Sequence, residues 1–139
     1  MDRVRPEPFV NADSKPYWSA AKEGRLVLQE CADCGHVDFM PRHICPACWS
    51  DNRKWINAAG TGIIHSFSIV HRAPLPAFRD DCPYVVALID LTEGARMMTN
   101  IVGEDALKVA IGDAVEICFE DRGYIRLPQF MRSKNIASL

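Results

Sequence analysis

Four cysteines in one short segment are the residues of this chain that most clearly point to chemistry. Cys31 and Cys34 form one Cys-x-x-Cys pair, and Cys45 and Cys48 form a second. Two thiolates that are two residues apart can bind one metal ion from a single tight turn, and two such turns complete a tetrahedral shell of four sulfurs. Because this shell has no open position for water or substrate, the spacing predicts a structural metal site, with Zn²⁺ as the expected ion.

Other uses of these cysteines have to be weighed against a zinc site. Two disulfides would need an oxidising compartment, and a redox Cys-x-x-Cys motif normally occurs singly beside a β-α-β pattern. Iron competes with zinc, because thiolate sites of the rubredoxin type accept either metal. His36 or His43 could replace one ligand, although four cysteines already fill the shell.

Composition places the chain among ordinary globular proteins. It has 139 residues, of which 48% are hydrophobic and 24% charged, enough for one domain or two small ones. Its net charge of -2 disfavours general nucleic-acid binding, which usually needs a basic surplus. No apolar run approaches the ~20 residues of a membrane span, and the N-terminus lacks a signal-peptide core. We therefore expect a cytoplasmic protein in which Cys82 and Cys118 are reduced.

The pattern of apolar and turn-forming residues predicts a mainly β protein with one short helix. The helix is expected over about residues 14–23, because Ser14 can cap it, Pro16 suits its first turn and Gly24 can end it. Three parts are expected: an N-terminal arm and helix (1–25), a zinc ribbon (26–57) and an OB-fold domain (58–139).

The ribbon is expected to contain two short strands and two tryptophans that cover the metal-binding turns. One strand leads into the first cysteine pair over 26–29, and a return strand follows over 37–40. Trp49 comes directly after the last cysteine, and Trp55 follows soon after. We expect both indoles to pack in the small core of the ribbon.

The rest of the chain reads as five short strands separated by turns. The expected ranges are 63–70, 84–91, 95–102, 115–120 and 124–127, with a helical turn over 104–109 and an exposed tail over 128–139. The second strand is apolar almost throughout, which suits a strand covered on both faces. Five strands with one short helical connection fit a small closed barrel such as the OB-fold.

Several of these features occur together, in the same order, in one known family. They are the run Leu26-Val27-Leu28-Gln29-Glu30-Cys31, the pair Pro41-Arg42 between the cysteine pairs, Trp55, Gly60-Thr61-Gly62, Pro83-Tyr84-Val85-Val86-Ala87 and Leu127-Pro128-Gln129-Phe130. This ordered set covers nearly the whole chain. It resembles the acyl-CoA-associated family that joins a rubredoxin-like zinc ribbon to an OB-fold.

The resemblance implies a non-catalytic accessory subunit in a hetero-oligomer with a thiolase-like enzyme. Members of the family partner thiolases, steroid side-chain aldolases, or archaeal acetoacetyl-CoA thiolase together with hydroxymethylglutaryl-CoA synthase. With no thiolase or hydratase domain attached, the chain looks most like the small subunit of benzoylsuccinyl-CoA thiolase from anaerobic aromatic degradation. Such a subunit is expected to stabilise the complex and to help bind CoA or the acyl group.

The chain itself offers poor candidates for thiolytic chemistry, which needs a nucleophilic cysteine, a base and an oxyanion hole. Cys118 alternates with two glutamates, whose negative charge raises the pKa of a thiol, and Cys82 lies between an aspartate and a proline. His65 is in phase with apolar neighbours and is expected to be structural, whereas His71 opens a loop where it could touch a ligand. We expect the catalytic residues to belong to the partner.

A long segment over 71–81 has chemistry suited to CoA. It combines an aromatic side chain that can stack with arginines that can pair with phosphate, between prolines that stiffen it. A solvated or protein-facing loop is the alternative. The residues expected to contact CoA or the partner are Arg72, Phe78, Arg79, Arg132 and Trp18.

Three other functions compete with the accessory role. Zinc ribbons and OB-folds also occur in single-stranded nucleic-acid-binding modules, which need a basic groove that this composition does not favour. A rubredoxin-like electron carrier would require iron in place of zinc. An independent acyl-CoA hydrolase would require catalytic residues that the chain does not offer.

Overall fold

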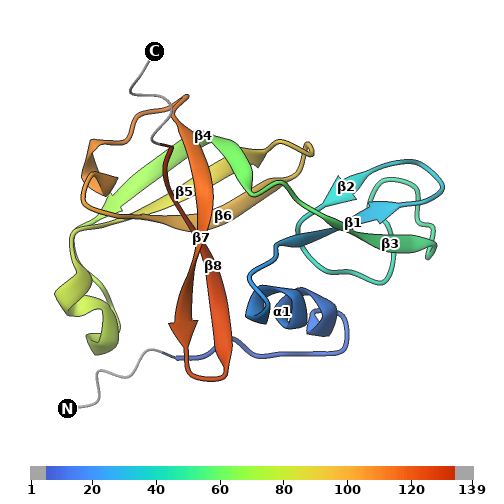
Figure 1. The fold of residues 1–139 in the computed structure, drawn as a ribbon, viewed down its shortest axis with the longest axis horizontal. Helices are drawn as coiled ribbons and strands as arrows, with labels where there is room; N and C mark the ends of the chain where they lie inside the picture. Colours follow the sequence, from blue (N-terminus) through green and yellow to red (C-terminus); the bar gives the residue numbers. More distant parts are fainter. Residues whose placement is uncertain (1–5, 134–139) are drawn as a thin grey trace.

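The computed structural model describes residues 6–133 of the chain. One helix, two 3-10 turns and eight strands follow one another there (Figure 1). They are α1 (Lys15–Lys22), β1 (Val27–Cys31), β2 (Val37–Asp38), β3 (Arg53–Asn57), β4 (Thr61–Val70), η1 (Pro76–Asp81), β5 (Tyr84–Leu91), β6 (Arg96–Val102), η2 (Ala106–Lys108), β7 (Ala114–Arg122) and β8 (Ile125–Arg132).

Five strands close into a barrel in the order β4-β5-β6-β8-β7. Every neighbouring pair is antiparallel except β6 and β8, and β7 pairs with the start of β4 to complete the ring. The short turn η2 lies between the third and fourth barrel strands, where a helical turn was predicted. The predicted mainly β fold with a five-stranded OB-type barrel is therefore confirmed.

Buried and half-buried residues alternate along β5, and this pattern separates the core of the barrel from its outer face. Val85, Ala87, Ile89 and Leu91 are buried and point inward, because successive side chains of a strand face opposite sides. The residues between them are half-buried. The apolar run is thus only partly covered on its outer side, in place of the full burial on both faces that was expected.

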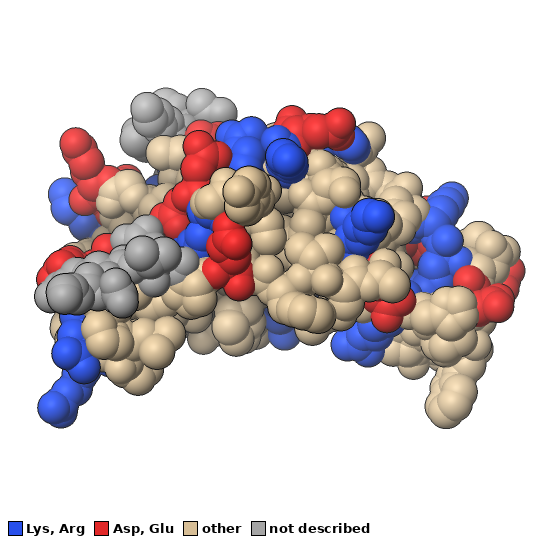
Figure 2. All heavy atoms as spheres, turned by 90° about the horizontal axis from the view of Figure 1, so that it is seen from below, with Lys and Arg blue, Asp and Glu red and all other residues tan. Residues whose placement is uncertain are grey.

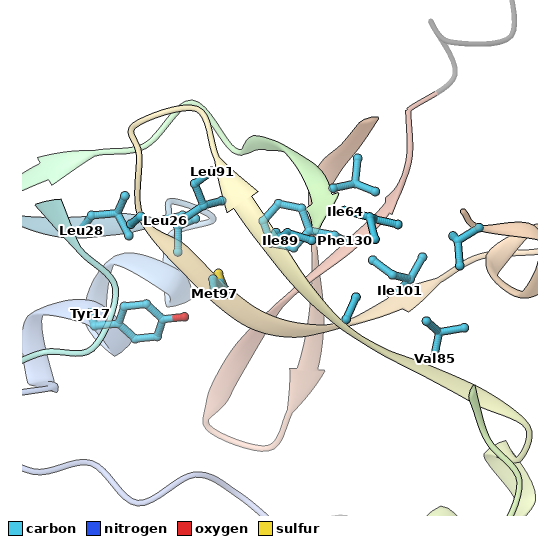
Figure 3. Packing of buried hydrophobic residues seen from close by; sticks show 14 residues of the cluster. Tyr17, Leu26, Leu28, Ile64, Val85, Ile89, Leu91, Met97, Ile101 and Phe130 are labelled. Atoms are coloured by element: carbon cyan, nitrogen blue, oxygen red, sulfur yellow. The ribbon is translucent and has the colours of Figure 1, made fainter. Parts of the chain in front are cut away.

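The ribbon forms a separate sheet in the order β2-β1-β3, and α1 packs against β1 and β8. Tyr17 of α1 and Leu28 of β1 belong to the same hydrophobic cluster as Met97 and Phe130 of the barrel, and Figure 3 shows this continuity. The helix therefore joins the two sheets through one apolar core, which offsets its marginal length as an isolated helix.

Two glycines allow the chain to pass from the ribbon into the barrel. Gly60 has φ +80°, and a Cβ there would lie 2.5 Å from Cγ2 of Ile117. A Cβ at Gly62 would lie 2.8 Å from the backbone oxygen of Asp90 on β5. Only glycine permits both the left-handed backbone and the close approach of β4 to its neighbours.

Local expectations for the N-terminal half needed correction. The side chain of Ser14 does not cap α1; the Ser14 N–H instead donates to Oδ1 of Asn11 at 2.8 Å. The ribbon has a third strand, β3, which contains Trp55 and pairs along β1. Trp49 is 83% exposed, so its predicted packing in the ribbon core is wrong.

The end of the barrel also differs from the prediction. The last strand does not stop at Leu127 but continues to Arg132, and Pro128, Gln129 and Phe130 are buried rather than part of an exposed tail. A mid-strand proline normally signals a strand end. It is tolerated because β6 pairs only with Phe130 and Met131, so β8 is unpaired on that side at Pro128. Residues 134–139 of the predicted tail lie outside the described residues.

Replacement of Phe130 by alanine tests this assignment of the last strand. Because the ring is fully buried in the shared core, Phe130→Ala should lower the free energy of unfolding by about 3–5 kcal/mol, measured by denaturant titration. The matched control is Tyr124→Ala, which removes an aromatic ring that is 86% exposed and should change stability by less than about 0.5 kcal/mol. Equal effects of the two substitutions would contradict the burial of β8.

Candidate functional site

The four cysteine sulfurs converge at one end of the ribbon. All four Sγ atoms lie within 4.8 Å of one another, with 3.6 Å between Cys31 and Cys48 and 3.7 Å between Cys34 and Cys45. Tetrahedral coordination with metal–sulfur bonds of about 2.3 Å places ligand sulfurs about 3.8 Å apart. The donor set therefore fits a structural four-coordinate metal ion, and His36 and His43 are not part of this group of ligand atoms among the described residues.

The two cysteine turns share one backbone geometry. The N–H of Gly35 donates to the carbonyl of Cys31, and the N–H of Trp49 donates to the carbonyl of Cys45, both at 2.9 Å. In each turn the N–H of the first cysteine also donates to the carbonyl five residues later. The turns are thus two copies of the same metal-binding loop, presented from opposite sides of the cluster.

Electrostatics make the cluster unstable as four free thiolates. The backbone N–H of Cys34 lowers the pKa of Cys31 to about 7. The N–H of Ser50 acts in the same direction on Cys48, but the neighbouring Cys34 and Cys31 sulfurs outweigh it and raise the pKa of Cys48 to about 12. The four thiols therefore do not all ionise together near neutral pH unless a cation displaces the remaining protons, and a divalent metal ion can do so.

Polar side chains hold the two turns in position. The hydroxyl of Ser50 donates to Asp33, which ties the second turn to the first. The buried guanidinium of Arg53 donates to the carbonyl of Ile44 at 3.2 Å and pairs with Asp38. These contacts orient the cysteines from outside the sulfur cluster.

A second feature is a groove of about 580 Å³ on the outer face of the barrel. It lies over β5 and β6 and is bounded by η1, η2 and the β7–β8 hairpin. This size is within the range of small-molecule sites, and OB-folds bind ligands on this face, between the loops after their first and fourth strands. Its lining residues are Phe78, Asp81, Pro83, Tyr84, Val86, Met98, Thr99, Asn100, Ile101, Val102, Gly103, Ala106, Leu107, Glu120, Arg122 and Gln129.

The groove is apolar with a few polar groups and little positive charge. Arg122 pairs with Glu120 and places its guanidinium 5.7 Å from the ring centroid of Phe78. The groove lining contains two carboxylates, those of Asp81 and Glu120, and only one arginine, Arg122. Asn100 contributes an amide, which donates to the carbonyl of Val85 at 3.0 Å. The groove is therefore better suited to an uncharged chain with amide groups than to phosphates.

The residues predicted to contact CoA or a partner do not all lie at one site. Phe78 lines the groove, and Arg72 and Arg79 are exposed on the same connection between β4 and β5. Arg132 instead pairs with two aspartates, Asp105 at 3.3 Å and Asp113 at 3.4 Å. Trp18 is half-buried in α1 with its ring edge-on to that of Tyr17, and it packs against the core.

Sequence reasoning missed most of the groove. Tyr84, Val86 and Met98 were assigned only to barrel strands, although their outward phase relative to the buried residues was readable. The opposite wall comes from the β7–β8 hairpin. This hairpin lies far from β5 in sequence, so no local pattern predicts that the two meet.

The remaining cysteines and histidines do not form a nucleophile–base pair in the part of the chain that the structure describes. Burial, together with Glu116 and Glu120, raises the pKa of the Cys118 thiol. The thiol of Cys82 donates to the carbonyl of Phe78 at 3.7 Å, and Nδ1 of His65 lies 3.5 Å from Asp90. Cys82 and His65 therefore have structural partners, and the Cys118 thiol is harder to ionise than a free thiol.

Acidic and basic side chains are interspersed with uncharged residues over the face seen in Figure 2. It shows no basic stripe of the kind that nucleic-acid backbones select. Within residues 6–133, none of the helices has the length and apolarity needed to cross a membrane.

Fold and cysteine cluster together define a protein that joins a zinc ribbon to an OB-fold, and comparison with known proteins agrees. Residues 18–52 match the family described as "ChsH2, rubredoxin-like zinc ribbon domain", and residues 55–120 match "ChsH2, C-terminal OB-fold domain". A "DUF35 domain-containing scaffold protein" from Methanothermobacter thermautotrophicus is 42% identical over 95 residues, which cover 68% of this chain and 71% of that protein. The chain belongs to the DUF35 family.

Other relatives are parts of enzymes or enzyme complexes. A solved chain described as "Ltp2-ChsH2(DUF35) aldolase" has a TM-score of 0.80 and 40% identity, covering 91% of this chain and 98% of that chain. A "Probable enoyl-CoA hydratase alpha subunit" from Thermomonospora curvata is 45% identical over 78% of this chain, which spans only 34% of that protein. "Benzoylsuccinyl-CoA thiolase subunit BbsA" from Geobacter metallireducens is 30% identical over 70% of this chain and 66% of its own length.

The cysteine geometry predicts one tightly bound metal ion per chain. Cys34→Ser should remove most of the metal measured by elemental analysis and lower the midpoint of thermal unfolding by about 10 °C or more, because metal binding contributes to folding. Cys118→Ser is the control and should retain the metal, since Cys118 lies on β7 outside the cluster. Full metal content in Cys34→Ser would show that the four sulfurs do not act together.

Proposed function

We propose that this chain is a non-catalytic accessory subunit of an acyl-CoA-processing complex, with the catalytic residues in a thiolase- or aldolase-type partner. The observation that carries the proposal is the similarity to the DUF35 chain of the Ltp2-ChsH2 aldolase, which extends over nearly the whole of both chains. The structural partners of Cys82 and His65 and the raised pKa of the Cys118 thiol support it, because they leave these groups without the activation that thioester chemistry needs.

The metal in this proposal is structural Zn²⁺ held by Cys31, Cys34, Cys45 and Cys48. Tetrahedral sulfur geometry, the match to a zinc-ribbon family and the closed ligand shell support zinc. A rubredoxin-like electron carrier would contain iron and be coloured. Elemental analysis that finds stoichiometric iron in place of zinc would favour that alternative.

The groove offers the proposed accessory subunit a place to bind a ligand. We infer that its apolar and amide-bearing lining holds the acyl or pantetheine portion of a CoA thioester, whose amides and methylene groups match it. Arg72 and Arg79 are exposed on the connection that carries Phe78, where they could pair with CoA phosphates. Arg132 is a weaker candidate than expected, because Asp105 and Asp113 already pair with it.

Sequence identity to relatives of known name favours one type of catalytic partner over another. Relatives named as an aldolase chain and a hydratase subunit are 40% and 45% identical, whereas BbsA is 30% identical. These values favour an aldolase-type partner over benzoylsuccinyl-CoA thiolase. A single-stranded nucleic-acid module is disfavoured, because two carboxylates and one arginine line the groove that such a ligand would use.

Co-production with candidate partners tests the accessory role. The chain should co-purify as a defined hetero-oligomer with a co-produced thiolase- or aldolase-type protein from the same organism, and cleavage of an acyl-CoA substrate should require that partner. Size-exclusion chromatography with light scattering measures the complex, and CoA release measures the activity. Acyl-CoA cleavage by this chain alone, or failure to assemble with any such protein, would contradict the proposal.

The arginines beside the groove give a separate prediction for the assembled complex. Joint replacement Arg72→Ala and Arg79→Ala should raise the KM for CoA or its thioester about fivefold or more, because two charge-assisted contacts to phosphate are lost. Lys54→Ala is the control, since this exposed cation pairs with Glu30 on the ribbon. An unchanged KM with intact assembly would remove the CoA-binding role of these arginines and leave the scaffold role standing.

A further inference from the structure

Trp49 combines two features that are unfavourable in an isolated chain. Its φ is +70°, and among the described residues it is the one non-glycine residue with a positive φ. Its side chain is also 83% exposed, although tryptophan is the largest apolar residue type. Backbone strain of this kind persists only where something compensates for it.

The first cysteine turn shows what the backbone at this position prefers. Gly35 occupies the equivalent place after its cysteine pair, with φ +79° and the same hydrogen bond to the first cysteine of the turn. Glycine adopts this conformation without the clash that a Cβ causes. No atom lies within 4 Å of where a Cβ at Gly35 would be, so the glycine there meets a demand of the backbone rather than of packing. Because position 49 has a similar positive φ, its backbone would also be less strained with glycine than with tryptophan.

The hydrogen bonds of the cysteine turn hold the backbone at Trp49, but the indole itself adds no compensating contact. An indole that is 83% exposed buries little apolar surface, and the aromatic ring pairs found among the described residues involve Tyr17, Trp18 and Phe39 instead. Two further apolar side chains in the same part of the ribbon, Met40 and Ile44, are 54% and 41% exposed. The segment from Met40 to Trp49, which contains the second cysteine pair, thus exposes three apolar side chains.

We propose that Trp49 is an anchor that inserts into an apolar pocket of the catalytic subunit, with the exposed Met40 and Ile44 of the same ribbon as additional apolar surface. The inference rests on the proposed accessory function and adds the residue by which the ribbon docks. A tryptophan on a turn held by a metal cluster is already fixed in position, so little conformational entropy is lost on binding. Buried tryptophans are also among the residues that contribute most to interfaces.

The catalytic subunit is preferred over a second copy of this chain as the occupant. A chain 40% identical to this one is described together with a different polypeptide, Ltp2, in one aldolase. The groove of a second copy is the place proposed above for a CoA thioester, so it is not left free for an indole.

Three metal-loaded variants separate this anchor from a structural role. Trp49→Gly removes the indole and the strain together, so its thermal midpoint should equal that of the wild type or exceed it by up to about 5 °C. Its Kd for the co-purifying catalytic subunit should nevertheless rise about 30-fold or more, the loss expected for an interface hot spot. Trp49→Phe keeps an aromatic anchor and should bind more tightly than Trp49→Gly.

The matched control is Gly35→Ala, which introduces strain at the equivalent position of the other turn and keeps Trp49. It should lower the thermal midpoint and leave the Kd for the catalytic subunit within about twofold. If Gly35→Ala weakened binding as much as Trp49→Gly, affinity would follow ribbon stability and the anchor would be wrong. A marked fall in the midpoint of Trp49→Gly would likewise overturn it, by showing that the indole packs within its own chain.

The outcomes also distinguish this inference from the function on which it rests. If the wild-type chain assembles with no thiolase- or aldolase-type protein, both the accessory function and the anchor fail. If the wild type assembles and Trp49→Gly assembles equally well, only the anchor fails. Sedimentation of the chain alone completes the test: a dimer abolished by Trp49→Gly, with unchanged affinity for the catalytic subunit, would assign Trp49 to self-association.

Discussion

The convergence of four cysteine sulfurs within 4.8 Å of one another is the constraint on which the ribbon depends. The β2 strand has only two residues, and the connections on either side of it are held mainly by the two cysteine turns and a few polar contacts. A sheet of this size buries too little apolar surface to be stable alone. A metal ion displaces the remaining thiol protons and cross-links the two turns, so metal binding contributes directly to the stability of the ribbon.

The ribbon is also coupled to the barrel, because the two share one apolar core. Tyr17, Leu26 and Leu28 pack in the same cluster as Leu91, Met97 and Phe130 (Figure 3). A helix that would not be stable in isolation thereby sets the position of the metal-binding end relative to the groove. If both surfaces contact one partner, this shared core is what keeps them at a constant separation.

Much of the fold and the metal cluster was readable from local patterns. Cysteine spacing identified the four ligand candidates because each pair acts within one turn, where sequence distance and spatial distance agree. Barrel strands were located from apolar alternation for the same reason. Errors fell where a distant contact overrides a local preference: Pro128 continues a strand because β6 leaves that edge unpaired, and β3 forms because β1 is available to pair with it.

Tryptophan 49 shows the difference most clearly. Sequence alone placed it beside the last cysteine and predicted burial, since large apolar side chains usually pack; the tertiary structure places it in solvent with a left-handed backbone. Sequence by itself determined the four candidate metal ligands, the mainly β class and the places of the five barrel strands along the chain, because these follow from spacing and periodicity. Only the tertiary structure decided which side chains line the groove, that Arg132 is held by two aspartates, and which apolar residues remain uncovered. Those properties depend on contacts between segments far apart in the chain, which no local pattern specifies.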